Sequence, residues 1–260
     1  MIKSYRKPYR VKKKKSVLKS RLFWRVVLVL IFMGVSSYFF FLSSIFKIKE
    51  INISGNPAFA EATAGRQKIL YQKIQKLLDT KNIFLIDFEE IKKEILEKFP
   101  QIASINIERK FPESITVQVE ERRGVAIFCQ IDSCFLIDKE GVIFENVSDK
   151  LGLVTIRPSL IESKRLGEKV LETSHMSSIL NIESKLRGDF KIAVEEILAV
   201  SNERLNIETL EGWEIYFDPS KDLDWQITKL KAVLEQEISA EKRKNLEYIE
   251  LRFGNLASYK

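Results

Sequence analysis

The sequence predicts an α+β protein in which one transmembrane helix is followed by two folded domains. Three observations predict this class. A long stretch without charged residues lies near the N-terminus, apolar and polar residues alternate in short segments after it, and apolar residues at helical spacing mark four helices among those segments. The order of these elements predicts a small strand–helix–helix–strand–strand domain and then a β-rich domain with an open sheet and two helices.

The membrane helix is predicted over residues 26–46, where none of 21 consecutive residues is charged. A helix of this length spans roughly 31 Å, which is close to the hydrocarbon thickness of a bilayer. A cleaved signal peptide would instead have a shorter apolar core with small residues at its end. Here aromatic residues precede Ser43 and the uncharged run continues to Phe46. We therefore expect an uncleaved membrane anchor.

The tail at residues 1–25 contains eleven lysines and arginines and no acidic residue. Basic residues stay on the cytoplasmic side of a first membrane helix, so the N-terminus is expected inside the cell and everything after residue 46 outside the cytoplasm. Without these eleven residues the formal net charge of +7 becomes −4. Beside a membrane, such a tail favours anionic lipid headgroups. Tyr5 and Tyr9 are too few to stack bases, so no nucleic-acid partner is expected.

The first folded domain is predicted over residues 47–121. Asp87 is a good N-cap residue with Glu90 three positions later, as in a capping box, and Pro100 stops the helix that follows. Alternating isoleucines and valines mark the strands on either side. The expected elements are a strand at 48–53, helices at 66–78 and 88–99, and strands at 105–108 and 115–119.

The second folded domain is predicted over residues 122–260 and is dominated by short strands. Asp138–Gly141 fits a hairpin turn, and Gly188 fits a helix stop. In the final strand, residues 246–253, alternation separates an apolar face from a face with polar side chains. The expected elements are strands at 125–129, 134–138, 142–145, 153–156, 192–199, 205–209, 213–217 and 246–253, with helices at 168–187 and 222–238.

The two cysteines, Cys129 and Cys134, flank a four-residue polar loop between apolar segments. If a hairpin closes there, the cysteines face each other at about 4.5–5.5 Å, a separation that a disulfide can span. A compartment outside the cytoplasm permits that bond. A disulfide and two free, half-buried thiols both fit this spacing.

No pattern of residues indicates catalysis or a cofactor. His175 is the single histidine and falls in an expected surface helix, where a solvated role is the ordinary interpretation. One histidine and two cysteines are too few for a closed zinc site. The acidic pairs are adjacent in sequence, as in Glu89–Glu90, so they do not converge as a catalytic dyad. We therefore expect no catalytic residue, no metal and no cofactor.

With the elements placed, the chain resembles the bacterial cell-division family FtsQ, called DivIB in Gram-positive bacteria. In that family a basic tail and a membrane helix precede a POTRA domain and a β-rich domain. Six segments carry the resemblance in the family's order, although Gly124 stands where the family usually has proline. They are IKEINISGN at 48–56, NIFLID at 82–87, the strand–turn–strand at 107–120, Glu121-Arg122 with Val125-Ala126, LIDKEGVIF at 136–144 and YIELRF at 248–253.

The resemblance implies an essential-type, non-enzymatic scaffold of the divisome. Such a protein binds small bitopic division proteins, FtsB-like and FtsL-like, outside the membrane and helps to regulate septal peptidoglycan synthesis. It also implies a single-pass protein of the cell membrane, inner where two exist, concentrated at the division septum. Contacts with other membrane proteins of the divisome are expected for the POTRA domain.

The expected mode of partner binding is strand addition to the last strand. A strand at the edge of an open sheet presents unpaired N–H and C=O groups that a partner segment completes. Alternation selects Tyr248, Glu250 and Arg252 as contact residues, and Phe253 is added because the family's aromatic residue at that place is implicated in binding. A plain core strand is the alternative.

Two other classes of function also fit a membrane-anchored chain of this size. One is a membrane-anchored cell-wall enzyme, which would need a cleft with converging acid, base or metal ligands. The other is a POTRA-containing protein of a different envelope assembly or secretion system. Such proteins usually precede a transmembrane β-barrel, and the strands here are of the soluble type.

Overall fold

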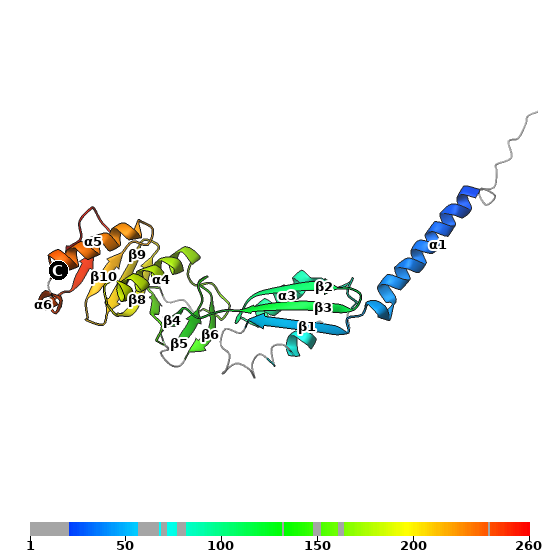
Figure 1. The fold of residues 1–260 in the computed structure, drawn as a ribbon, viewed down its shortest axis with the longest axis horizontal. Coiled ribbons are helices and arrows are strands. Elements are labelled where there is room, and N and C mark those ends of the chain that lie inside the picture. Colours follow the sequence, from blue (N-terminus) through cyan, green and yellow to red (C-terminus); the bar gives the residue numbers. More distant parts are fainter. Residues whose placement is uncertain are drawn as a thin grey trace, which may run out of the picture.

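The computed structural model describes residues 21–56, 68, 72–76, 82–131, 133–147, 152–160, 164–238 and 240–260. Within them the chain forms one N-terminal helix and two separate sheets with helices, which confirms the predicted α+β class. The molecule is elongated, with the N-terminal helix at one end and the C-terminus at the other (Figure 1). Most of the predicted basic tail, and most of the predicted helix at 66–78, lie outside the described residues.

The N-terminal helix, α1 (Arg21–Leu42), carries exposed apolar side chains along its length and is long and apolar enough to cross a membrane. It ends at Leu42, whereas the uncharged run extends to Phe46. The reason is local: the Ser43 hydroxyl accepts a hydrogen bond from the Ile45 amide at 3.3 Å and opens a short 3₁₀ helix, η2 (Ser44–Phe46). Lipid is the environment that suits a helix which is apolar on all sides.

The first domain is a three-stranded sheet covered by helices. Strand β3 (Ser114–Glu121) is central, with β1 (Glu50–Asn56) parallel to it and β2 (Ile102–Lys110) antiparallel. Its inward side chains, Ile115, Val117 and Val119, are fully or almost fully buried, as alternation predicts. Helix α3 (Phe88–Lys98) begins at the predicted cap, because Asp87 Oδ1 accepts from the amides of Glu89 at 3.0 Å and Glu90 at 3.3 Å. Of the other predicted helix, residues 72–76 are helical and Ile74 is buried.

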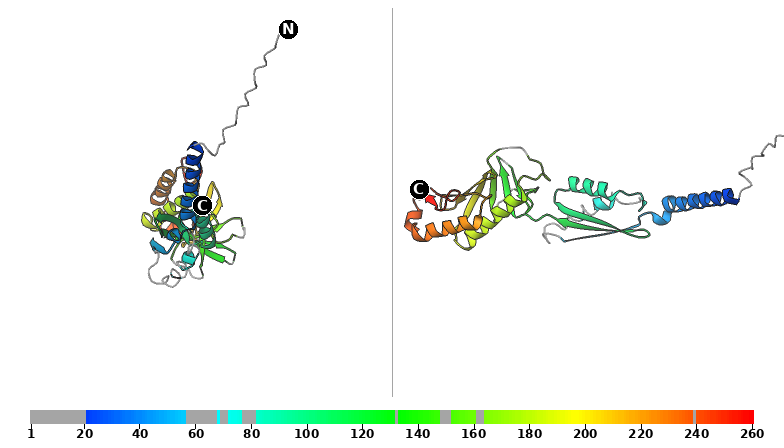
Figure 2. Two further views of the ribbon diagram at one scale, coloured as in Figure 1. Left: turned by 90° about the vertical axis from the view of Figure 1, so that its right-hand side faces the viewer. Right: turned by 90° about the horizontal axis from the view of Figure 1, so that it is seen from above.

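The second domain is a nine-stranded open sheet among the described residues. Its order is β12-β11-β10-β9-β8-β7-β4-β5-β6. Helices α4 and α5 lie on the same face of this sheet, and their apolar side chains form one core with it (Figure 2). The bounds are β4 Ala126–Gln130, β5 Ser133–Ile137, β6 Ile143–Val147, β7 Thr155–Pro158, α4 Thr173–Gly188, β8 Val194–Ser201, β9 Arg204–Thr209, β10 Glu214–Phe217, α5 Leu223–Gln236, α6 Ala240–Arg243, β11 Tyr248–Glu250 and β12 Ser258–Tyr259.

Helix α4 begins at Thr173 rather than near residue 168. The preceding backbone is engaged elsewhere, because the amides of Gly167 and Val170 donate to the carbonyls of Ile143 and Gly141 at 2.7 and 2.8 Å. Gly141 has a φ of +85°, and a Cβ there would lie 1.9 Å from the Leu171 carbonyl oxygen. Tertiary pairing with the hairpin therefore overrides the helical pattern of these residues.

The hairpin of β4 and β5 brings the two cysteines together. Cys129 pairs directly with Cys134 in the antiparallel register, with their Cα atoms 4.1 Å apart, and their sulfur atoms are bonded. The bonded pair lies one position from the turn and therefore links the two strands at the closed end of the hairpin.

Residues 246–253 were predicted to form one strand at or near an edge of the sheet. The strand does lie near an edge, but its predicted length and its place as the last strand of the chain were wrong. The strand β11 contains three residues, Tyr248–Glu250, and pairs parallel with β10 on one side. The chain then turns back, and β12 pairs antiparallel with the other side of β11. The sheet is open, as predicted, but its outer strand at this end is Ser258–Tyr259.

Arg122 connects the two domains. Its Nε donates to the Pro100 carbonyl at 3.1 Å, and its backbone amide donates to the Gln101 carbonyl at 2.8 Å, both in the first domain. Its guanidinium also forms a salt bridge with Asp138 in the second domain. Asp138 Oδ1 in turn accepts from the amides of Glu140 and Val142, both at 2.9 Å, which shapes the predicted hairpin turn. The side chains of Arg122 and Asp138 are only 13% and 6% exposed.

We predict that Arg122→Met destabilises the full-length protein by about 2–4 kcal/mol, because the buried Asp138 side chain would lose its ion-pair partner. Thermal unfolding in detergent, followed by circular dichroism, measures this loss. The neighbouring Arg123 is exposed, so Arg123→Met is the matched control and should change stability by less than about 0.5 kcal/mol. Equal effects of the two substitutions would contradict a specific role for Arg122.

Candidate partner-binding surface at the terminal strands

Three exposed apolar side chains lie within the last eight residues of the chain. Phe253 is 62% exposed, Leu256 is 84% exposed and Tyr259 is 42% exposed. We call these residues the terminal apolar group. Large apolar side chains that remain in water near one strand mark a candidate contact surface for another protein.

Strand β11 has the two faces that alternation predicts. Ile249 is fully buried under α5, whereas Tyr248 and Glu250 lie on the face opposite to the helices and are half-buried. The Tyr248 ring stacks on the ring of Tyr216 in β10, with centroids 5.4 Å apart and planes inclined by 19°. This cross-strand contact packs the two parallel strands together.

Glu250 and Arg252 bind each other. Arg252 Nε and Nη2 donate to the two carboxylate oxygens of Glu250 at 2.9 and 2.6 Å, and the Arg252 amide donates to Glu250 Oε1 at 2.9 Å. Burial opposes the ionised form of Glu250, but the hydrogen bonds from Arg252 outweigh it and lower the pKa of that carboxyl. Because the side chains are only about 15% exposed, this pair holds the bend after β11 and offers little free hydrogen-bonding capacity.

Arg204 and Tyr216, which the sequence analysis did not select, also lie on this polar face. The guanidinium carbons of Arg204 and Arg252 lie 5.1 and 5.8 Å from the centroid of the Tyr216 ring, and that of Arg252 also lies 4.8 Å from the Phe253 ring. Alternation in residues 204–209 and 214–217 places Arg204 and Tyr216 on this face. The sequence did not show that β9, β10 and β11 are neighbours in the sheet, so these two residues could not be grouped with Tyr248 and Arg252.

A buried lysine ends β11. Lys229 on α5 is 6% exposed, and its ammonium donates to the carbonyl oxygens of Leu251, Phe253 and Gly254, the last two at 3.4 and 3.3 Å. Burial lowers the pKa of Lys229. Because these carbonyls accept hydrogen bonds from Lys229 on α5, they do not continue the β-sheet pairing, and the strand ends. Gly254 has a φ of +57°, which lets the chain turn there.

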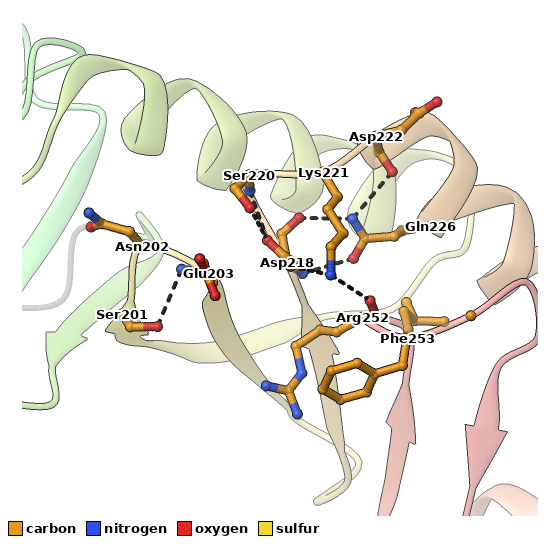
Figure 3. A network of polar contacts seen from close by, with 12 residues as sticks. Ser201, Asn202, Glu203, Asp218, Ser220, Lys221, Asp222, Gln226, Arg252 and Phe253 are labelled. Carbon is orange, nitrogen blue, oxygen red and sulfur yellow. Dashed lines mark hydrogen bonds and ion pairs between the residues drawn. The ribbon is translucent and has the colours of Figure 1, made fainter.

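A polar network on the helix side fixes the same bend (Figure 3). The Gln226 amide bridges both backbone groups of Asp218 at 2.8 Å, and Lys221 joins the Asp218 carboxylate at 2.8 Å to the Arg252 carbonyl at 3.1 Å. Burial opposes ionisation of Asp218, but hydrogen bonds from Lys221 and Ser220 prevail and lower its pKa. The Phe253 ring therefore projects from a backbone that is held on both sides.

The tail covers the outer edge of β11 with few contacts. The Glu247 and Tyr248 amides donate to the Lys260 carbonyl at 2.7 and 3.3 Å, and the Lys260 amide donates to Tyr248 at 3.1 Å. A hydrogen bond from Lys260 to Glu247, with an ion pair at 2.8 Å, raises the pKa of Lys260. Ser258 and Tyr259 are both exposed, so this edge strand has no cover of its own.

The remaining ionisable candidate, His175, lies away from these strands. It is half-buried on α4 beside a cavity of about 240 Å³, and its Nε2 is 3.2 Å from the Asn202 carbonyl oxygen. It is therefore less solvated than the sequence suggested. Among the residues that the structure describes, no group of three or more His, Cys, Asp or Glu side chains is placed to hold a metal ion.

Comparison with known proteins assigns both sheets. Residues 46–122 match the family model "POTRA domain, FtsQ-type", and residues 128–252 match "Cell division protein FtsQ/DivIB, C-terminal". The chain is 22% identical over 198 residues to a cell division protein DivIB of Clostridium tetani, covering 74% of this chain and 71% of that protein. It is 28% identical over 167 residues to a cell division protein FtsQ of Syntrophotalea carbinolica, covering 62% of this chain and 54% of that protein. Two matching domains in this order, behind one membrane helix, show that the chain belongs to the FtsQ/DivIB family of bacterial cell-division proteins.

Proposed function

We propose that this protein is a non-enzymatic scaffold of the divisome that binds FtsB-like and FtsL-like proteins outside the membrane and thereby helps to regulate septal peptidoglycan synthesis. Membership of the family gives the role in cell division. The observation that carries partner binding is the terminal apolar group, which stays exposed beside a thinly covered strand.

We propose the topology of a single-pass membrane protein with a cytoplasmic N-terminus and both sheets outside the cytoplasm. The division into a tail at 1–25, a membrane segment at 26–46, a POTRA domain at 47–121 and a β domain at 122–260 is part of this proposal. The limits of the two family matches support it, as does α1, the one helix among the described residues that is long and apolar enough to cross a membrane. The basic tail would lie against anionic lipid headgroups on the cytoplasmic side.

The partner would dock by pairing with the outer edge of β11 in place of β12. The tail is held there by its two-residue pairing with β11 and by three further backbone hydrogen bonds at Lys260. Because each backbone bond contributes about 0.5–1.5 kcal/mol net, a longer strand could displace so short a segment. Phe253 would then supply the main side-chain contact, because it is exposed on a fixed backbone. Tyr248, Glu250 and Arg252 would shape the surface beside it, with the Glu250–Arg252 pair keeping its internal contacts.

An N-terminal fluorescent fusion of the full chain should form a band at midcell in dividing cells. The prediction follows from recruitment by other membrane proteins of the divisome. Live-cell imaging measures it, and a fusion that ends after residue 46 is the control for the membrane helix alone. A uniform membrane signal from the full chain would contradict the proposed role.

Replacing Phe253 with Asp should weaken binding of FtsB-like partners by about 30-fold, the usual cost of about 2 kcal/mol for removing an aromatic contact. Biolayer interferometry with the full-length protein in nanodiscs measures this change. Leu210→Asp is the matched control, because Leu210 is 66% exposed in the same domain and lies in the turn between β9 and β10. Equal losses for both variants would rule out a specific contact at Phe253.

Removing residues 257–260 should strengthen binding of an isolated partner segment, on the order of tenfold, because the tail would no longer compete for β11. The same measurement applies, with circular dichroism to verify that the sheet is retained. Weaker binding by a folded variant would show that the partner pairs with β12 itself, and displacement would then be wrong.

A further inference from the structure

The end of the POTRA domain next to α1 has an exposed apolar surface. Its members come from three separate segments: η2, the link before α3 and the turn between β2 and β3. We call them the membrane-proximal collar. They are Ile45, 44% exposed, Phe84, 38%, Leu85, 65%, and Phe111, 59%.

Aromatic contacts join this collar to the membrane helix. Phe84 has ring centroids 5.9 Å from Phe40 in α1 and 5.0 Å from Phe46 in η2, and it stacks on Phe111 at 5.3 Å. Phe40 and Phe46 also lie 5.4 Å apart. The turn of the β2–β3 hairpin is therefore linked to the last turn of the helix through the Phe84 ring, which contacts both.

Hydrogen bonds fix the same junction. The Asn82 side chain donates to the carbonyls of Phe40 and Phe41 at 3.2 and 2.9 Å, which are C-terminal carbonyls of α1 without helical partners. The Ile83 amide donates to the Phe46 carbonyl at 2.9 Å. A domain held in this way stays at a fixed height relative to the helix end.

When α1 spans a bilayer, that height corresponds to the boundary between water and hydrocarbon, because the helix is about as long as the hydrocarbon core is thick. The helix ends at Leu42, three residues before the collar begins at Ile45. Beyond the hydrocarbon core, each interfacial layer is about 5–7 Å thick, and aromatic side chains are enriched there. Two exposed lysines lie next to the collar in sequence, Lys47 after Phe46 and Lys110 before Phe111. At this height their ammonium groups would form ion pairs with headgroup phosphates.

We propose that the membrane-proximal collar is embedded in the interfacial layer of the bilayer, so that lipid is its partner and the POTRA domain rests on the membrane surface. The adjoining membrane helix argues for this occupant, because lipid necessarily surrounds the neighbouring turns of α1. The proposal depends on α1 crossing the membrane, and not on the partners proposed above or on which side of the membrane the two domains lie.

The test places an environment-sensitive fluorophore on Leu85→Cys in the full chain reconstituted in phosphatidylcholine–phosphatidylglycerol vesicles. Cys129 and Cys134 are bonded to each other, so the introduced thiol is the one that reacts. Leu256→Cys is the matched control, because Leu256 is 84% exposed. It lies four residues before the C-terminus, which is at the opposite end of the molecule from α1 (Figure 1). A second reporter at Phe111→Cys guards against a local effect at one position.

At positions 85 and 111 we expect blue-shifted fluorescence emission. Lipids that carry a spin label just below the headgroup should quench roughly half of the fluorescence intensity, as for groups about 5–10 Å deep in the boundary. Leu256 should emit as in water. Water-like emission at both collar positions would overturn the proposal. So would shielding that varies with the protein-to-lipid ratio, since that result would assign the collar to a second protein.

Discussion

The arrangement of the two domains depends on one buried carboxylate. Asp138 binds the amides that form its own hairpin turn and also the guanidinium of Arg122, which in turn holds the end of the POTRA sheet through Pro100. With 6% exposure, the carboxylate needs all of these partners, because an unpaired buried charge is costly. The hairpin of β5 and β6 is therefore held against the end of the POTRA sheet through Arg122.

Local patterns predicted the elements well wherever short-range physics decides them. Asp87 caps α3, Ile115, Val117 and Val119 point into a core, and Asp138–Gly141 turns a hairpin. The failures have tertiary causes. Residues 168–171 were predicted as helix but pair with the hairpin backbone, and residues 251–253 were predicted as strand, although the carbonyls of Leu251 and Phe253 accept from Lys229. Neither partner is close in sequence, so no local pattern shows them.

The candidate site was only partly foreseeable for the same reason. Alternation selected Tyr248, Glu250 and Arg252, which do lie together, but it could not show that two of them satisfy each other. It also missed Tyr216 and Arg204, which neighbouring strands bring beside them. Between them, these contacts use up much of the polar capacity of the surface. What remains for recognition is an apolar side chain on a rigid bend and a strand edge under a weakly held tail.

The junction at Asn82 has a mechanical consequence. The Asn82 amide holds two carbonyls of the membrane helix, and the four rings of Phe40, Phe46, Phe84 and Phe111 contact one another at the same junction. The POTRA domain therefore cannot swivel freely about the helix axis. The side of the helix that faces a neighbour in the bilayer therefore determines which side of the POTRA domain that neighbour meets. Any twist applied to the transmembrane segment is passed on as torque to the domain next to it.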